Sequence, residues 1–142
     1  ETLLNTFWDL GHDILLQEFI HESQGRDIRA LVVGGQVVAA MRRQARAGEF
    51  RSNIHRGGEG TPIDLPADYV ETAVAAARVV GLEVAGVDLL ESRRGPMLME
   101  VNSSPGFEGI ESATGVDVAG AITGRAARLA QEHLARRPES SR

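Results

Sequence analysis

The stretch Glu100-Val101-Asn102-Ser103-Ser104-Pro105-Gly106 decides the fold when it is read together with Asp88 upstream. Between them, Ser92-Arg93-Arg94-Gly95-Pro96 is a strong turn signal. The flanking residues 83–90 and 97–101 are rich in Val, Leu and Met. This pattern predicts a β-hairpin.

A turn centred on Arg94 places Asp88 directly opposite Glu100, with Asn102 on the same face. Opposed Cβ atoms in an antiparallel pair lie roughly 4.5–5.5 Å apart, and like charges there repel each other. A hard cation with oxygen ligands would relieve that repulsion. The alternative is a solvated polar face whose carboxylates point into water. The opposite face is the predicted core side, and it carries Val87, Leu89, Met99 and Val101.

The composition is that of an ordinary globular protein. The chain has 142 residues, of which 42% are hydrophobic, 25% charged and only 4% aromatic, so its core must be aliphatic. This is the size of one domain, or of a piece of a larger protein. The net charge of −5 argues against wholesale binding to a nucleic-acid backbone. The absence of cysteine excludes disulfides and thiolate metal sites. No apolar run reaches membrane-spanning length, and we expect a cytoplasmic protein.

All basic residues are arginine, so chemistry that needs a lysine ammonium must take it from outside this chain. The chain starts without methionine, and the apolar residues among the first eight follow helical spacing. We therefore expect a helix cut from a longer protein. The polar tail, residues 136–142, is expected to be disordered.

The patterns along the rest of the chain predict an α+β fold, because antiparallel hairpins alternate with helices. The expected elements are a helix over residues 1–10, a strand over 13–20, a polar loop over 21–25, a hairpin of 27–33 and 36–41 around Gly34-Gly35, a helix over 66–80, the 83–102 hairpin, a loop with a short helical turn over 103–115, and a helix after Asp117 that ends near residue 134.

Residues 42–61 form an arginine- and glycine-rich segment without periodicity. Glycine lets a backbone approach a ligand closely, and arginine suits phosphate or carboxylate. The first alternative is a solvated surface loop. The second is RNA binding, which is disfavoured because Phe50 is the only aromatic residue available for stacking.

Five segments of this chain occur in an order that resembles the RimK-type ATP-grasp ligases over about residues 1–130. Single motifs of this kind are weak, but five in order are specific. They are Leu16-Gln17-Glu18-Phe19-Ile20, Gln24-Gly25-Arg26-Asp27-Ile28-Arg29, Phe50-Arg51-Ser52-Asn53-Ile54-His55-Arg56-Gly57-Gly58, Ala85-Gly86-Val87-Asp88-Leu89-Leu90 and Met99-Glu100-Val101-Asn102-Ser103-Ser104-Pro105-Gly106.

The resemblance implies an ATP-grasp fold, in which two α+β lobes clamp ATP. Residues 1–135 would be the C-terminal portion of that domain, with an antiparallel sheet and flanking helices. The implied activity is an ATP-dependent carboxylate–amine ligase that adds L-glutamate to the C-terminus of a small-subunit ribosomal protein, or to a related carboxylate, through an acyl phosphate. The isolated fragment is expected to be inactive. The alternatives are a non-catalytic nucleotide- or metal-binding module, and a ligase with a peptide or small-molecule acceptor.

The resemblance also implies residue roles. Glu18 and Phe19 would meet the adenine, and Asp27 would lie near the ribose. The implied nucleotide-binding triplet is Arg51, Ser52 and Asn53, and the implied ligands of two Mg²⁺ or Mn²⁺ ions are Asp88, Glu100 and Asn102. No catalytic residue is assigned, and the roles of Arg29, Arg42, Arg43 and His55 stay open. The implied partners are ATP, glutamate and a carboxylate acceptor, without nucleic acid or membrane, and the full-length enzyme is expected to be a homo-oligomer.

Overall fold

Two β-hairpins form the centre of the structure, a computed structural model that describes residues 2–45 and 59–136. They join in one five-stranded antiparallel sheet with the order β3-β2-β1-β4-β5. Both predicted hairpins are thereby confirmed: the one around Gly34-Gly35, and the one whose turn falls within residues 92–96. The strands are β1 (Arg26–Val33), β2 (Gln36–Gln44), β3 (Glu59–Pro62), β4 (Val84–Ser92) and β5 (Gly95–Asn102).

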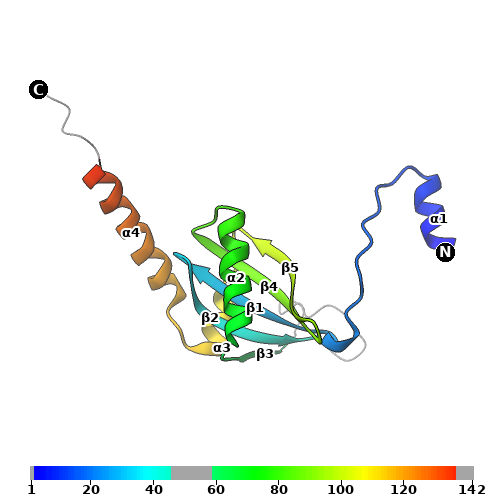
Figure 1. Cartoon of the computed structure of the whole chain (residues 1–142), viewed down its shortest axis with the longest axis horizontal. Coiled ribbons are helices and arrows are strands. Elements are labelled where there is room, and N and C mark those ends of the chain that lie inside the picture. The colour runs from blue at the N-terminus through cyan, green and yellow to red at the C-terminus, as the bar shows by residue number, and fades with distance from the viewer. Residues whose placement is uncertain (1, 46–58, 137–142) are drawn as a thin grey trace, which may run out of the picture.

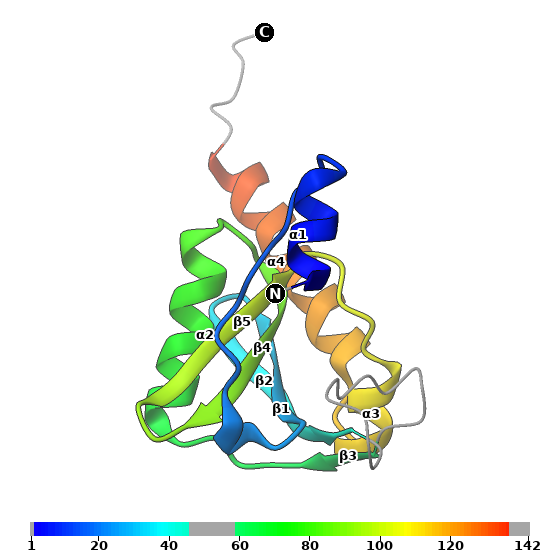
Figure 2. The same ribbon diagram turned by 90° about the vertical axis from the view of Figure 1, so that its right-hand side faces the viewer.

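Helices cover both faces of this sheet. Helix α2 lies across one face, and α3 with the start of α4 lies on the other (Figures 1 and 2). The predicted α+β class is therefore confirmed. None of the helices in the described part of the chain is long and apolar enough to cross a membrane. The helical elements are α1 (Thr2–Asp9), η1 (His21–Ser23), α2 (Ala67–Val79), α3 (Glu108–Thr114) and α4 (Val118–Arg136).

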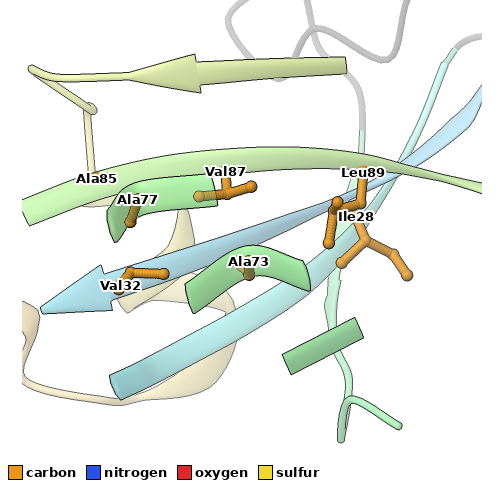
Figure 3. Close-up of a cluster of buried hydrophobic side chains, with 8 residues drawn as sticks. Ile28, Val32, Ala73, Ala77, Ala85, Val87 and Leu89 are labelled. Atoms are coloured by element: carbon orange, nitrogen blue, oxygen red, sulfur yellow. The ribbon is translucent and has the colours of Figure 1, made fainter. Parts of the chain in front are cut away.

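Helix α2 has clear boundary signals in the sequence. Pro66 occupies the position just before it, and Gly81, beyond its end, has a φ of +72° that glycine adopts without strain. Ala73 and Ala77 face the sheet, and their small side chains let the helix approach it closely (Figure 3). The buried cluster under α2 consists of Ile28, Ala30, Val32, Ala73, Ala77, Ala85, Val87 and Leu89. Val80, just beyond the end of α2, is 53% exposed and lies outside this cluster.

A second, smaller cluster lies on the other face of the sheet. Asp117 accepts a hydrogen bond from the amide of Gly120 at 2.7 Å and thereby caps the start of α4. Helix α4 then runs away from the sheet (Figure 1), and Ala126 in its middle is accordingly exposed. The buried members of this cluster are Leu31, Ala39, Met41, Ile110 and Val118.

The predicted strand over residues 13–20 is wrong. Residues 12–20 form no strand and run away from the sheet toward α1 (Figure 1). A strand needs a neighbour for its backbone hydrogen bonds, and no described strand pairs with this segment. Leu15 and Leu16 are accordingly 83% and 72% exposed. We call residues 10–20 the N-terminal arm.

Two further expectations about loops need correction. The segment expected to be a loop over residues 42–61 begins and ends in strand, because β2 continues to Gln44 and β3 starts at Glu59. Residues 46–58 lie outside the described residues, as does the tail from residue 137. The polar loop over 21–25 contains the short helix η1 followed by Gln24, which has a left-handed φ of 49°.

Candidate functional site

Charged side chains gather on the face of the sheet opposite α2. Arg29 on β1 pairs with Asp88 on β4, and Asp88 pairs on its other side with Glu100 on β5. In the next row, Asp27 on β1 pairs with Arg43 on β2. Asp27 and Arg29 share this face because side chains alternate along a strand. Four neighbouring strands thus bring five charged groups together.

The prediction that Asp88 lies opposite Glu100 is confirmed, although the turn differs from the one expected. The turn has two residues, with Ser92 paired to Gly95, and an irregularity after Asp88 makes Met99 an extra residue in β5. That bulge restores the Asp88–Glu100 pairing. It also explains why Met99 is 41% exposed, whereas it was expected in the core.

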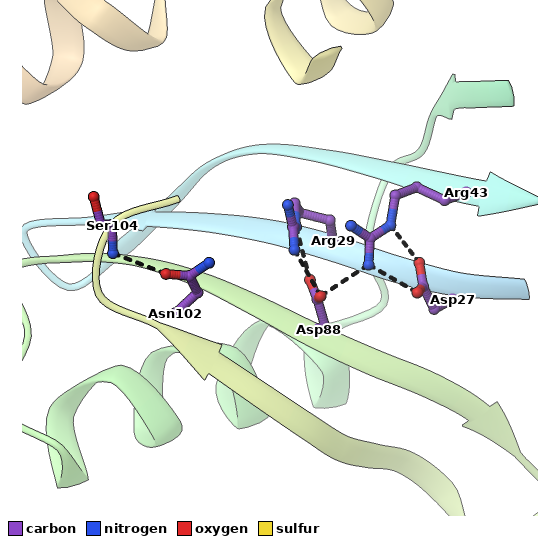
Figure 4. Close-up of polar contacts among 6 residues, drawn as sticks. All are labelled: Asp27, Arg29, Arg43, Asp88, Asn102 and Ser104. Atoms are coloured by element: carbon purple, nitrogen blue, oxygen red, sulfur yellow. Dashed lines mark hydrogen bonds and ion pairs between the residues drawn. The ribbon is translucent and has the colours of Figure 1, made fainter. Parts of the chain in front are cut away.

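Asp88 is held by two arginines from the neighbouring strands (Figure 4). Arg29 donates from Nε to Oδ1 at 2.8 Å and from Nη2 to Oδ2 at 2.7 Å. Arg43 donates from Nη2 to the same Oδ2 at 2.8 Å. Arg43 also holds Asp27 through two bonds of 2.6 and 2.7 Å. We call these four residues the ion-pair network.

The ion-pair network is largely closed to solvent. Asp27, Arg43 and Asp88 are 4%, 6% and 3% exposed. Burial alone would lower the pKa of Arg43, but its hydrogen bonds to the two carboxylates and their negative charges outweigh it, so the pKa is raised. The two arginines, and not only a bound metal ion, can therefore relieve the charge repulsion expected around Asp88.

Glu100 and Asn102 lie at the open edge of this face. Glu100 is exposed and has no ion pair with any described residue. Asn102 accepts a hydrogen bond from the amide of Ser104 at 2.9 Å (Figure 4). The chain can turn back here because a Cβ on Gly86, the strand partner of Asn102, would lie only 2.8 Å from the Cβ of Pro105. Glycine at position 86 thus sets the path of the segment that follows Asn102.

The donor set on this face fits a hard divalent cation. Asp88, Glu100 and Asn102 offer carboxylate and amide oxygens, the ligands that Mg²⁺ and Mn²⁺ take. Among residues 2–45 and 59–136, no three His, Cys, Asp or Glu side chains are grouped so as to hold a metal by themselves. A metal ion bound here would therefore also need the amide oxygen of Asn102 and oxygen atoms from a bound ligand.

The predicted nucleotide residues fall into three groups. Asp27 is buried in the ion-pair network. Glu18 lies on the N-terminal arm and pairs with Arg94 at the tip of the β4–β5 turn at 2.8 Å. Phe19, beside it, is 56% exposed and meets the ring of His21 edge-on, with 4.8 Å between centroids. The third group, residues 51–53, lies outside the described residues.

The partners of Asp88 were not predicted from the sequence. The roles of Arg29 and Arg43 stayed open there, and in the structure these arginines bind Asp88 and Asp27. A signal was present in the alternation of Asp27 and Arg29 along one strand face. Arg42, the third open arginine, lies on the other face and binds Glu91 at 2.7 and 3.1 Å.

Comparison with known proteins gives the site a context. Residues 1–125 match the RimK-like ATP-grasp domain. The chain is 62% identical over 122 residues to a probable alpha-L-glutamate ligase of Syntrophotalea carbinolica, covering 86% of this chain and 40% of that protein. It is 54% identical over 136 residues to a probable alpha-L-glutamate ligase of Pseudomonas aeruginosa, covering 96% and 45%. The chain thus spans less than half the length of these relatives.

Solved structures give the same picture. The ATP-grasp ligase PsnB, complexed with a phosphomimetic variant of its minimal precursor, Mg and ADP, superposes with a TM-score of 0.61 at 27% identity, over 82% of this chain and 34% of that one. The D-alanine–D-alanine ligase of Bacillus anthracis, complexed with ATP, superposes with a TM-score of 0.61 at 19% identity, over 93% and 47%. The second likeness concerns the fold alone.

Proposed function

The chain belongs to the RimK-like ATP-grasp family, and from that premise we propose that it is part of an ATP-dependent ligase that forms an amide bond with L-glutamate. The ATP-grasp fold and the family, both predicted from the sequence, are confirmed. The observation that carries the proposal is the pairing of Asp88 with Glu100 on one sheet face, beside Asn102.

We propose that Asp88, Glu100 and Asn102 hold the divalent cations that accompany ATP, Mg²⁺ or Mn²⁺. Their oxygen atoms suit such ions, and the structure of PsnB is of a complex with Mg and ADP. When bound, the cation neutralises charge on the nucleotide phosphates. The protein's part is to keep the three side chains on one rigid face, which the ion-pair network and the close approach of Pro105 to Gly86 support.

The chemistry proposed for the complete enzyme has two steps. A carboxylate oxygen of the acceptor attacks the γ-phosphorus of ATP, and the β–γ bond breaks to give an acyl phosphate and ADP. The amine of glutamate then attacks the acyl carbon, and phosphate leaves as the amide forms. Because negative charge moves between oxygens in the first step, positioning and charge neutralisation supply most of the catalysis.

Nucleotide binding is the second proposed role of this chain. We propose that the N-terminal arm meets the adenine through Glu18 and Phe19, and that Asp27 lies near the ribose. The triplet Arg51, Ser52 and Asn53 is proposed to contact the nucleotide as well. The exposed ring of Phe19 and the position of Glu18 beside the hairpin tip are compatible with this role.

The names of the relatives favour glutamate as the amine substrate. For the acceptor we propose the C-terminus of a small-subunit ribosomal protein, with a peptide or a small carboxylate as the alternative. A cytoplasmic location and a homo-oligomeric full-length enzyme stay predictions.

The competing function is a nucleotide- or metal-binding module without catalysis. The presence of all three predicted metal ligands on one face favours the ligase, because phosphoryl transfer needs the complete ligand set, whereas a module that no longer performs it can lose one of these side chains and still bind nucleotide.

Glu100→Gln in the full-length protein tests the ligase. This change removes a negative ligand and keeps the shape, so ADP release with glutamate and a peptide acceptor ending in glutamate should fall by orders of magnitude. Glu91→Gln is the matched control, because Glu91 lies on the adjacent strand and binds Arg42 on the other face. Mass spectrometry should find added glutamate in the wild-type and control reactions.

Undiminished turnover by a folded Glu100→Gln protein contradicts the assignment, and the absence of ADP release by the wild type with any acceptor favours the non-catalytic module.

A further inference from the structure

The hydrogen bonds on Asp88 leave it little capacity for a further ligand. An ionised carboxylate offers about four lone-pair positions over its two oxygens. Arg29 takes one on each oxygen, and Arg43 takes a second on Oδ2. The remaining position is on Oδ1. Asp88 can therefore offer an incoming cation one oxygen while both arginines stay in place.

The arginines are themselves held firmly. The guanidinium of Arg43 spans two strands, with Asp27 on one side at 2.6 and 2.7 Å and Asp88 on the other at 2.8 Å (Figure 4). Its side chain is 7% exposed and that of Arg29 is 14% exposed. A planar guanidinium that bridges two carboxylates in this way fixes their orientation, and an ammonium group does not reproduce its fork.

We infer that Arg29 and Arg43 are positioning residues that present Asp88 to a cation through the single oxygen Oδ1. The inference rests on the proposed function in one respect, that Asp88 is a metal ligand. Neither arginine touches the nucleotide in this account. Their effect on the nucleotide passes through Asp88 and the bound cation.

The ion-pair network also sets the net negative charge that this face presents to a metal cation. Arg29 and Arg43 cancel the charges of Asp27 and Asp88, so the free negative charge on this face is carried by Glu100, which has no ion pair with a described residue. One uncompensated carboxylate attracts a divalent cation weakly, and the phosphates of the nucleotide supply the remaining negative charge. The cation should therefore bind together with the nucleotide and not ahead of it.

The competing account has the arginines release Asp88 and grip the nucleotide phosphates directly. The two accounts differ in what happens without metal. Positioning residues that act through Asp88 affect nucleotide affinity only when a divalent cation is present. Residues that grip phosphate affect the affinity of metal-free nucleotide at least as strongly, because the phosphates are then more negative.

The test is the affinity of the full-length protein for ADP, measured by calorimetry with Mn²⁺ and again with EDTA. Arg29→Gln and Arg43→Lys should weaken ADP binding in Mn²⁺ by about 10- to 100-fold, as expected for residues that orient a metal ligand, and should leave the affinity in EDTA unchanged. Electron paramagnetic resonance should show more free Mn²⁺ in these variants at the same ADP concentration. The matched control is Arg42→Gln, which removes an arginine from the other face of β2 and should change neither affinity.

Arg43→Lys keeps the positive charge between the two aspartates, so it should fold, and circular dichroism checks that. Equal weakening in EDTA and in Mn²⁺ overturns the inference in favour of direct phosphate binding, and unchanged affinity in Mn²⁺ overturns it as well. Asp88→Asn separates this inference from the proposed function. If Asp88→Asn leaves the ADP affinity in Mn²⁺ unchanged, the metal role of Asp88 itself is wrong. If Asp88→Asn weakens it and the arginine variants do not, only the positioning role is wrong.

Discussion

The two hairpins of the sheet are built alike but treat their charges in opposite ways. Each has a two-residue turn and one bulged residue, Val38 in β2 and Met99 in β5. The first hairpin has a strand on each side, and most of its charged side chains are paired with one another or with carboxylates on β4. The second ends at the edge of the sheet, where Glu100 is exposed. Charge in the interior is neutralised by the protein, and charge at the edge stays available to a ligand.

The largest expected effect is the difference in free energy of unfolding between substitutions at Arg43 and at Arg42, which lie on opposite faces of β2. Arg43→Met leaves two buried carboxylates without their shared partner and should lower the free energy of unfolding by about 3–5 kcal/mol. Arg42→Gln removes a half-exposed pair with Glu91 and should cost less than about 1 kcal/mol. Urea denaturation of both variants checks this. Similar losses in the two would mean that burial does not distinguish the ion-pair network from the half-exposed pair on the other face of the same strand.

Substitutions of Asp88 and Glu100, the two opposed carboxylates, compare a buried charge with an exposed one within the second hairpin. Asp88→Asn weakens three hydrogen bonds to charged donors and should lower the free energy of unfolding by about 1.5–3 kcal/mol. Glu100→Gln, directly opposite, should change it by no more than about 0.5 kcal/mol, because Glu100 is exposed. Thermal denaturation of the two proteins side by side makes the measurement. A larger loss for Glu100→Gln would show that the edge carboxylate has a structural partner.

Gly86→Ala tests how the edge hairpin passes into the segment after Asn102. The new methyl group would lie 2.8 Å from the Cβ of Pro105, so one of the two segments must shift, at a cost of about 1–3 kcal/mol. Because Gly86 pairs with Asn102, the affinity for ADP in Mn²⁺ should fall too. Calorimetry checks the affinity and urea denaturation the stability. An unchanged affinity despite lost stability would separate Asn102 from the site.

Regular elements of this chain could be read from the sequence because their signals are local. The helix after Pro66 and both hairpins follow from residues within a few positions of each other. The N-terminal arm could not be read in this way, since its apolar run is typical of a strand but no described strand pairs with it. Whether such a segment becomes a strand depends on a partner far away in the sequence.

The site could be predicted only in part, because the residues of a turn do not show whether the strands beside it contain a β-bulge. Counting outward from the turns pairs Asp27 with Arg42 and Asp88 with Met99, whereas the bulges make the partners Arg43 and Glu100. The expected turn centre at Arg94 happened to give the right partner for Asp88. In the first hairpin, the bulge at Val38 hides the pairing of Asp27 with Arg43 from the turn signal, so the ion-pair network could not be predicted from it.

The central claim is that this face holds cations with the nucleotide while the ion-pair network stays intact. The most direct test is a crystal structure of the full-length protein with ADP and Mn²⁺, with anomalous scattering used to locate the metal. The account predicts Mn²⁺ coordinated by Oδ1 of Asp88, a carboxylate oxygen of Glu100 and the amide oxygen of Asn102, with Arg29 and Arg43 still bound to Asp88. Mn²⁺ bound away from these residues, or either arginine bound to the phosphates of ADP in place of Asp88, would contradict it.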